Sequence, residues 1–174
     1  MIIFLNGPFG IGKTTVGKLL QLRLENSILF DPEEIGFMLR NVLCELDPVT
    51  DFQDYTLWRQ LIPIVAELLQ KKYERSLILP MTIWRPEYFD QVLSGLQAVD
   101  SPVYVYTLIA RPEILRERIL SRDFAVEWSL ERMDQWLHNF KRMDLGTTKD
   151  TSDMSPSVVV NTIIKNIDEP LECK

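Results

Sequence analysis

Short runs of apolar residues alternate along the chain with segments whose apolar residues recur every three or four positions. The uninterrupted runs cover residues 2–5, 28–30, 77–82 and 103–109, and such runs are typical of strands buried on both faces. Three segments between them have helical spacing: Val16, Leu19, Leu20 and Leu24; Ile35, Met38, Leu39, Val42 and Leu43; and Trp58, Leu61, Ile62, Val65 and Leu69, with Pro63 as an expected kink. This alternation predicts an α/β fold whose parallel sheet carries helices on both faces.

The C-terminal part of the chain has a mixed pattern. The β-branched residues of 157–167 favour a strand, whereas Ser155-Pro156 resembles a helix N-cap followed by proline at the first helical position. Apolar residues also keep helical spacing through this segment, at Val159, Val160, Ile163, Ile164 and Ile167. We therefore expect a helix here and place a short fifth strand near residues 145–149.

Length and composition narrow the class of protein. The 174 residues fit a single domain covering 1–174, and a net charge of −6 argues against a nucleic-acid surface. Cys44 and Cys173 are far apart, which favours two reduced thiols over a disulfide or a metal site. No apolar run approaches the roughly 20 residues of a membrane-spanning helix, and the N-terminus does not fit a signal peptide. We expect a cytoplasmic protein, and the sequence does not predict its oligomeric state.

Residues 7–14 read GPFGIGKT and fit the P-loop pattern G-x-x-x-x-G-K-[ST] between the first strand and the first helix. Glycines let successive backbone N–H groups point at phosphate oxygens, and the helix N-terminus adds a positive dipole end. A chance match is the alternative, but the flanking strand and helix argue against it. We expect ATP to bind here, with Lys13 at the β- and γ-phosphates and the Thr14 hydroxyl on Mg²⁺. The residues expected to bind ATP are Gly7, Phe9, Gly10, Ile11, Gly12, Lys13, Thr14 and Thr15, together with Arg118 after the fourth strand.

Acidic residues follow the second strand directly, in the segment Asp31-Pro32-Glu33-Glu34. A capping box with proline at the first helical position is the structural interpretation. Ligands bind at the carboxyl ends of strands in open α/β sheets, which favours Asp31 as a Mg²⁺ ligand and Glu33 as the base for an acceptor hydroxyl. Glu33, Gly36, Phe37 and Arg40 share one face of the next helix, which is either an acceptor pocket or a solvated polar surface.

Two arginines lie four residues apart after the fourth strand, on one helix face with Leu115 and Ile119. Arg118 is expected to stack on the adenine base, and Arg122 to stabilise the transferring phosphoryl group. An exposed basic helix paired with acidic neighbours is the alternative. The helical pattern breaks between 123 and 128, and Ser129 is the expected cap of a helix that continues to Phe140, so we expect a mobile lid at about 118–130.

The chain resembles the tunicamycin-resistance family within the shikimate kinase and nucleoside monophosphate kinase group of P-loop kinases. The segments NGPFGIGKT, DPEEIGFMLR, DFQDYTLWR and LPMTIWRPEYF carry this resemblance across nearly the whole chain. It implies a five-stranded parallel sheet, ATP binding, and resistance to a nucleoside-like antibiotic by phosphorylation. Asp31-Pro32-Glu33 corresponds to the Asp-x-Asp motif of shikimate kinase, and Leu115, Arg118 and Arg122 correspond to the L-x-x-R-x-x-x-R lid motif. Arg59 and the aromatic residues of 52–59 are expected beside the acceptor, although Trp58 also fits the core.

Two departures from the family pattern limit what can be transferred. Residues 79–82, Leu-Pro-Met-Thr, offer no Walker B carboxylate, and the glycines that bind shikimate after the third strand are missing. The sequence therefore predicts an ATP-dependent kinase acting on a hydroxyl of a nucleoside-like or sugar acceptor. Its alternatives are a non-catalytic ATP-dependent antibiotic-binding protein and a nucleoside monophosphate kinase. His138 has no partner at a catalytic spacing, so we expect it to have a surface or packing role.

Overall fold

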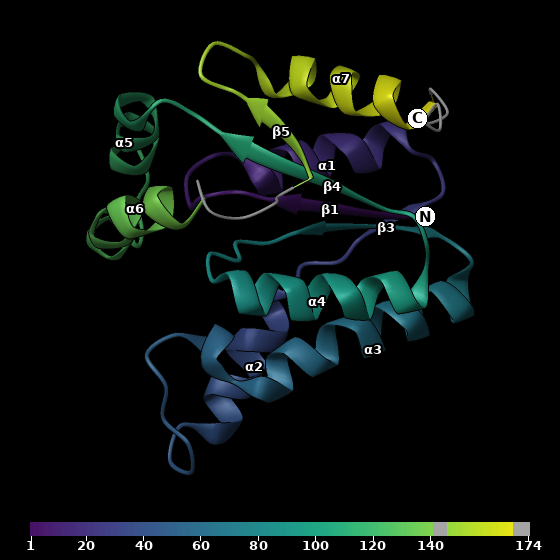
Figure 1. Ribbon diagram of the computed structural model, residues 1–174, viewed down its shortest axis with the longest axis horizontal. Helices are drawn as coiled ribbons and strands as arrows, with labels where there is room; N and C mark the ends of the chain where they lie inside the picture. Colours follow the sequence, from purple (N-terminus) through teal and green to yellow (C-terminus); the bar gives the residue numbers. More distant parts are fainter. Residues whose placement is uncertain (141–145, 169–174) are drawn as a thin grey trace.

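Five parallel strands form one sheet in the order β2-β3-β1-β4-β5 in the computed structural model, which describes residues 1–140 and 146–168 (Figure 1). The strands are β1 Ile2–Asn6, β2 Ser27–Leu29, β3 Ser76–Pro80, β4 Val103–Ile109 and β5 Thr147–Asp150. In the centre, Phe4 of β1 lies opposite Leu79 of β3 and Val105 of β4. The predicted five-stranded parallel sheet is confirmed. Residues 147–149 of the predicted fifth strand lie in β5, whereas Leu145 lies outside the described residues.

Helices cover both faces of this sheet. They are α1 Lys13–Arg23, α2 Glu33–Leu43, α3 Thr56–Tyr73, α4 Pro86–Val99, α5 Pro112–Leu120, α6 Val126–Phe140 and α7 Pro156–Asp168, with a short 3-10 helix, η1, at Phe52–Asp54. Figure 1 shows α1 and α7 on one face of the sheet and α3 and α4 on the other. The helix α7 confirms the helical interpretation of the C-terminal segment. No helix within 1–140 or 146–168 has the length and apolarity needed to cross a membrane.

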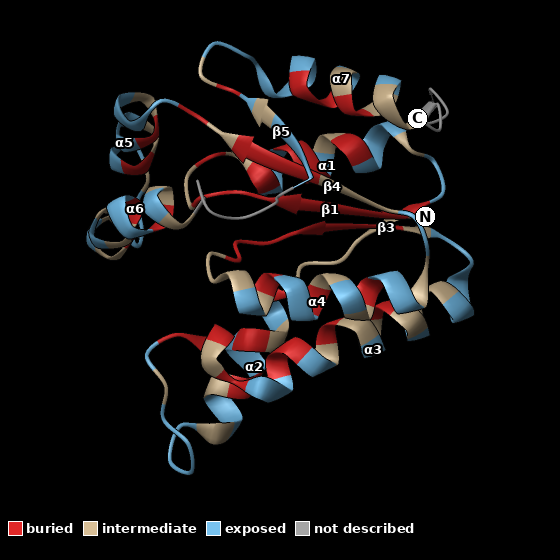
Figure 2. Ribbon diagram, in the orientation of Figure 1, coloured by how far each residue is buried: buried red, intermediate tan, exposed pale blue. Residues whose placement is uncertain are grey.

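The central strands are buried on both faces, as the uninterrupted apolar runs predict (Figure 2). Ile2 and Phe4 pack in the core beneath α3 and α4, whereas Ile3 and Leu5 pack in the core beneath α1 and α7. Alternate side chains of a strand point to opposite faces, so one short strand contributes to both cores. The sheet is thereby held firmly between two helical layers, and its carboxyl edge provides a rigid base for the loops that follow.

The buried face of α2 differs from the predicted stripe. Met38 and Val42 are 49% and 71% exposed, whereas Gly36 and Leu39 are buried. The reason is the aromatic ring of Phe52, which lies so close to Gly36 that a Cβ there would be 2.5 Å from it. The gap left by this glycine is therefore filled by the protein's own core and is not part of an acceptor pocket.

The helices α5 and α6 lie beyond the carboxyl ends of β1 and β4 (Figure 1). The helix α6 begins at Val126, three residues before the cap predicted at Ser129. Ser129 instead lies within the first turn of the helix, where its hydroxyl donates a hydrogen bond to the carbonyl of Ala125, the residue before the helix, at 2.6 Å. Only residues 121–125 therefore separate the two helices, which makes the connection shorter than the predicted lid.

Candidate active site

The loop after β1 is anchored at its start by a buried asparagine. The Asn6 Oδ1 accepts hydrogen bonds from the backbone N–H groups of Gly7 and Ile83, both at 2.9 Å, and its Nδ2 donates to the Ile83 carbonyl at 3.2 Å. At the other end of the loop, Gly12 precedes α1 with φ of 101°, a left-handed conformation that strains other residues. The sequence motif thus forms the backbone turn that a P-loop requires.

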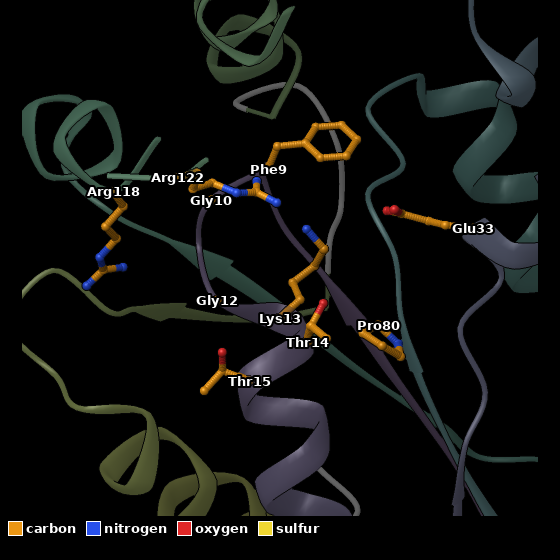
Figure 3. Close-up of a pocket in the computed structure, with 10 residues that line it drawn as sticks. All are labelled: Phe9, Gly10, Gly12, Lys13, Thr14, Thr15, Glu33, Pro80, Arg118 and Arg122. Carbon is orange, nitrogen blue, oxygen red and sulfur yellow. The ribbon is translucent and has the colours of Figure 1, made fainter. Parts of the chain in front are cut away.

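A cleft of about 250 Å³ opens over this loop (Figure 3). Its walls are Phe9, Gly10, Gly12, Lys13, Thr14, Thr15, Glu33, Pro80, Arg118 and Arg122. Figure 3 shows Glu33 and Arg118 on opposite sides of the cleft, with Lys13 and Arg122 between them. The structure therefore brings together the P-loop, the acidic start of α2 and both predicted arginines, which come from distant parts of the chain.

Lys13 is buried at the base of the cleft. Its Nζ donates hydrogen bonds to the carbonyls of Gly7 and Pro8, at 2.8 and 2.9 Å, and lies 5.5 Å from the centroid of the Phe9 ring. Burial away from water lowers the pKa of Lys13 to about 8. Two neutral carbonyls only partly compensate the ammonium charge, so an anion in the cleft would stabilise it strongly.

Two carboxyl groups lie at the start of α2. Burial raises the pKa of Glu33, and the Asp31 carboxylate raises it further, whereas Lys13 and Arg122 oppose this increase. The Asp31 Oδ1 accepts a hydrogen bond from the Glu33 backbone N–H at 3.0 Å, so it stabilises the first turn of the helix. Burial also raises the pKa of Asp31. Glu33 thus lines the cleft, whereas Asp31 is not one of its lining residues but lies within electrostatic range of Lys13.

The arginines of the predicted lid both line the cleft, Arg118 from α5 and Arg122 from the connection after it, so they do not share one helix face as predicted. Neither forms an ion pair with an acidic side chain in the described part of the chain. Glu113 forms an ion pair with Arg111, at 3.4 Å. The Arg122 guanidinium lies 4.3 Å from the centroid of the Phe124 ring and acts electrostatically on both Lys13 and Glu33. This geometry favours the functional interpretation of Arg118 and Arg122 over an exposed basic helix.

A second pocket, of about 170 Å³, adjoins the first and shares Gly10, Gly12, Thr15 and Arg118 with it. Its lining combines the P-loop and α1 with the loop after β5: Gly10, Ile11, Gly12, Thr15, Val16, Arg118, Thr151, Met154, Pro156 and Val159. No sequence motif marks Thr151, Met154 or Pro156 as part of a binding pocket. Only the strand order, which places β5 beside β4, brings their loop to the nucleotide site.

Arg59, which was predicted to contact an acceptor, forms several hydrogen bonds inside the protein. The guanidinium donates hydrogen bonds to the carbonyls of Gln53 and Tyr55, to Thr56 Oγ1 and to Gln91 Oε1, and it lies 4.0 Å from the centroid of the Tyr88 ring. These bonds connect η1 to α3 and α4. These internal hydrogen bonds give Arg59 a structural role, and its contact with an acceptor stays a prediction.

Phe37 and Arg40 lie on α2 outside the cleft walls. The Phe37 ring contacts Phe52 edge to face at 5.6 Å between centroids, and the Arg40 guanidinium lies 5.5 Å from the centroid of the same ring. The Arg40 Nε is buried and forms no hydrogen bond in the part of the chain that the structure describes. The contact of these two residues with an acceptor stays a prediction.

The P-loop on the central strand, with basic and acidic side chains across the cleft, defines a P-loop protein of kinase-like fold. A family model described as an AAA domain matches residues 2–143, and the chain belongs to this family. A tunicamycin resistance protein from Deinococcus radiodurans has 28% sequence identity and a TM-score of 0.78 over 95% of this chain and 94% of its own. The expected resemblance to that family of proteins is thereby confirmed.

More distant structures share the fold alone. A sugar kinase from Janibacter sp. HTCC2649 has a TM-score of 0.69 and 16% identity, over 96% of this chain and 94% of its own. A shikimate kinase from Bacteroides thetaiotaomicron has a TM-score of 0.60 and 16% identity, over 99% of both chains. No curated protein sequence matches the chain.

Proposed function

We propose that this protein is an ATP-dependent phosphotransferase. It transfers the γ-phosphoryl group to a hydroxyl of a nucleoside-like or sugar acceptor, with tunicamycin as the acceptor suggested by the name of the Deinococcus relative. The observation that carries this proposal is the shared cleft, in which the Lys13 ammonium and the Glu33 carboxyl group face each other over the P-loop. One group binds the phosphoryl donor, and the other is placed to accept a proton.

The two adjoining pockets have the arrangement that ATP needs. The triphosphate fits the P-loop cleft, where backbone N–H groups, the start of α1 and Lys13 supply positive charge. The adenine base fits the second pocket, beside the guanidinium of Arg118. Arg118 lines both pockets, so it stands between the base and the phosphates.

The oxygen donors near the phosphate cleft suit a magnesium ion. Mg²⁺ is usually held by one or two carboxylates together with substrate phosphates and water. The exposed Thr14 hydroxyl lines the cleft, and the Asp31 carboxylate lies close enough to act on Lys13. No cluster of three or more His, Cys, Asp or Glu side chains that could hold a metal alone occurs in the described residues. This limited donor set fits an ion that arrives with ATP, where it would neutralise phosphate charge.

Each charged side chain of the cleft has its own role in the phosphoryl transfer. Glu33 accepts the proton of the acceptor hydroxyl as its oxygen forms a bond to the γ-phosphorus. The bond from that phosphorus to the β–γ bridging oxygen breaks, and ADP leaves with the electron pair. Lys13 and Arg122 stabilise the negative charge on the transferring group and on the leaving phosphate.

The charges on the acceptor side favour an uncharged acceptor. The carboxyl groups of Glu33, Asp31 and the buried Asp51 are near one another, and both aspartates raise the pKa of Glu33. Arg59 is engaged in internal hydrogen bonds, and Arg85 pairs with Asp54 at 2.8 Å. An anionic acceptor would be repelled by these carboxyl groups, and the guanidinium groups of Arg59 and Arg85 are already engaged with other partners. This distribution supports a nucleoside-like or sugar substrate over a nucleoside monophosphate.

One observation favours a second candidate, an ATP-dependent protein that binds the antibiotic without phosphorylating it. The end of β3 and the residues after it, Pro80, Met81 and Thr82, supply no acidic side chain for the metal. Mg²⁺ would then depend on Asp31, whose Oδ1 already accepts the hydrogen bond from the Glu33 backbone. Weaker metal binding would leave nucleotide affinity intact while slowing transfer.

The decisive experiment combines labelled ATP and Mg²⁺ with tunicamycin, uridine, uridine monophosphate and simple sugars. We expect acceptor-dependent ADP release with an uncharged acceptor. Glu33→Gln should lower the rate by about 10²- to 10⁴-fold, the usual contribution of a general base, while the ATP affinity stays within about twofold. Lys13→Ala should weaken both binding and transfer. Glu34→Gln is the matched control, since this exposed neighbour lies outside the cleft.

Three results would contradict the proposal in different ways. Full turnover by Glu33→Gln would exclude Glu33 as the base. Stoichiometric tunicamycin binding without ADP release would support the non-catalytic candidate. Faster turnover of uridine monophosphate than of uridine would instead support a nucleoside monophosphate kinase.

A further inference from the structure

The Arg118 guanidinium is held in place by a single residue of the loop after β5. Its Nη1 donates a hydrogen bond to Thr151 Oγ1 at 3.0 Å, and its Nη2 donates to the Thr151 carbonyl at 2.7 Å. Two bonds to one residue fix both the position and the plane of a guanidinium. This orientation decides which face Arg118 presents to the two pockets that it lines.

Thr151 is itself fixed to the end of β4. It is 3% exposed, its backbone N–H donates to the Ile109 carbonyl at 2.8 Å, and its hydroxyl donates to the same carbonyl at 3.0 Å. Because the hydroxyl proton is directed at Ile109, a lone pair of Oγ1 is left to accept from Arg118. A continuous chain of hydrogen bonds therefore leads from the sheet to the guanidinium.

The partners of Arg118 are both neutral oxygens, whereas Arg111, at the start of α5, pairs with the carboxylate of Asp153 on the same loop as Thr151, at 2.8 Å. No carboxylate in the described part of the chain forms an ion pair with Arg118. A guanidinium that is oriented by neutral groups keeps its full charge for a ligand, since a carboxylate partner would compete with phosphate or an aromatic base.

We propose that Thr151 is a positioning residue for nucleotide binding, which it serves by orienting Arg118 between the base pocket and the phosphate cleft. The inference rests on the proposed ATP-binding function and adds a residue that no motif marks. Valine at this position would keep the shape of threonine but remove the hydroxyl. The Arg118 Nη1 would then face a methyl group without an acceptor, and the guanidinium would be held only by the carbonyl of residue 151, so its plane would no longer be fixed.

The test is calorimetric titration of MgATP into the wild-type protein and its variants. Thr151→Val should weaken MgATP binding by about tenfold, the loss expected for one hydrogen bond to a charged group. Thr151→Ser keeps the hydroxyl and should bind within about twofold of wild type. Arg111→Gln is the matched control, because it removes an exposed ion pair from the same loop and should also change affinity by less than about twofold.

A double-mutant cycle separates positioning from general damage to the loop. Arg118→Gln alone should weaken MgATP binding, and Thr151→Val added to it should weaken binding little further, because both changes remove the same contact. If Thr151→Val fails to fold, Thr151→Ala replaces it in this cycle.

Thr151→Val with the MgATP affinity of wild type would overturn the inference. So would a loss of affinity in Thr151→Ser or Arg111→Gln as large as that in Thr151→Val. Additive losses in the double-mutant cycle would overturn it as well. A wild-type protein without affinity for MgATP would instead overturn the proposed function as well, so the two failures are distinguishable.

Discussion

The buried ammonium group of Lys13 destabilises the folded protein as long as no anion is bound beside it. Its pKa decreases from 10.5 to about 8 on burial, and this difference corresponds to about 3 kcal/mol at most. Between these two values the unfolded chain binds more protons than the folded one, so stability increases with pH over this window. Below pH 8 the destabilisation is present in full.

A single substitution tests this cost. Lys13→Met should increase the free energy of unfolding of the ligand-free protein by about 1–3 kcal/mol at pH 7, because it removes the buried charge and keeps the apolar stem. The gain should shrink as the pH rises from 8 to 10.5. Urea denaturation at several pH values measures it, with the exposed Lys18→Met on the same helix as the control. A loss of stability at pH 7 would contradict the prediction.

The side chains of Lys13 and Glu33 should set the pH dependence of activity. Glu33 must be ionised to act as a base, and burial raises its pKa above the ordinary 4.5. As the pH is lowered, kcat/KM should therefore begin to decrease while the pH is still above 4.5. Lys13 must be protonated to bind phosphate, so kcat/KM for ATP should decrease again as the pH rises through about 8. Steady-state rates over pH 4.5–9.5 test both limbs. A rate that stays constant between pH 7 and 9 would show that Lys13 titrates elsewhere.

At the scale of elements, α2 depends on one close contact between a glycine and an aromatic ring. Gly36→Ala should destabilise the protein by about 1–3 kcal/mol, the usual cost of overpacking a core, because the added Cβ would lie 2.5 Å from Phe52. Phe52 also contacts Trp58, with ring centroids 5.3 Å apart, so it has little room to move. Thermal unfolding measures the effect, and Phe52→Leu in the same chain should recover part of it. An unchanged melting temperature would contradict this packing.

The connection between α5 and α6 should respond to the nucleotide. Arg122 lines the phosphate cleft and is followed by the exposed residues Asp123, Phe124 and Ala125, so trypsin should cut after Arg122 in the free protein. Saturating MgATP should slow this cut by about tenfold, because phosphate contacts order the segment. Cleavage after Lys72, at the end of α3, serves as the internal reference. Equal rates of cleavage after Arg122 with and without nucleotide would argue against a lid.

Elements with strong local signals could be predicted from the sequence, and elements decided by tertiary packing could not. The apolar runs gave β1 and β4 nearly their observed bounds, and the P-loop motif marked the phosphate cleft. The face of α2 was mispredicted because Phe52, from a distant turn, packs on Gly36. The internal hydrogen bonds of Arg59 could not be predicted, because its backbone acceptors are not visible in a sequence. Thr151 was missed because only the strand order brings its loop to Arg118.

For the whole molecule, nucleotide binding should appear as added stability. MgATP at a hundred times its dissociation constant should contribute about 2.7 kcal/mol, which for a chain of this length raises the melting temperature by roughly 5–10 °C. Differential scanning calorimetry with and without MgATP measures this shift. Lys13→Ala should reduce it strongly, because the charge that holds the phosphates is gone. A wild-type melting temperature that does not respond to MgATP would remove the basis of the proposed function.

The strand order has a consequence for how such a protein can change over evolution. The P-loop strand is central, the groups assigned to ATP's base follow β4 and β5 on one flank, and the acidic groups assigned to the acceptor follow β2 on the other. Mutations that remodel one flank leave the other undisturbed, because the rigid centre of the sheet separates them. Changes in α2 and its surroundings could therefore alter the acceptor while ATP remains the phosphoryl donor.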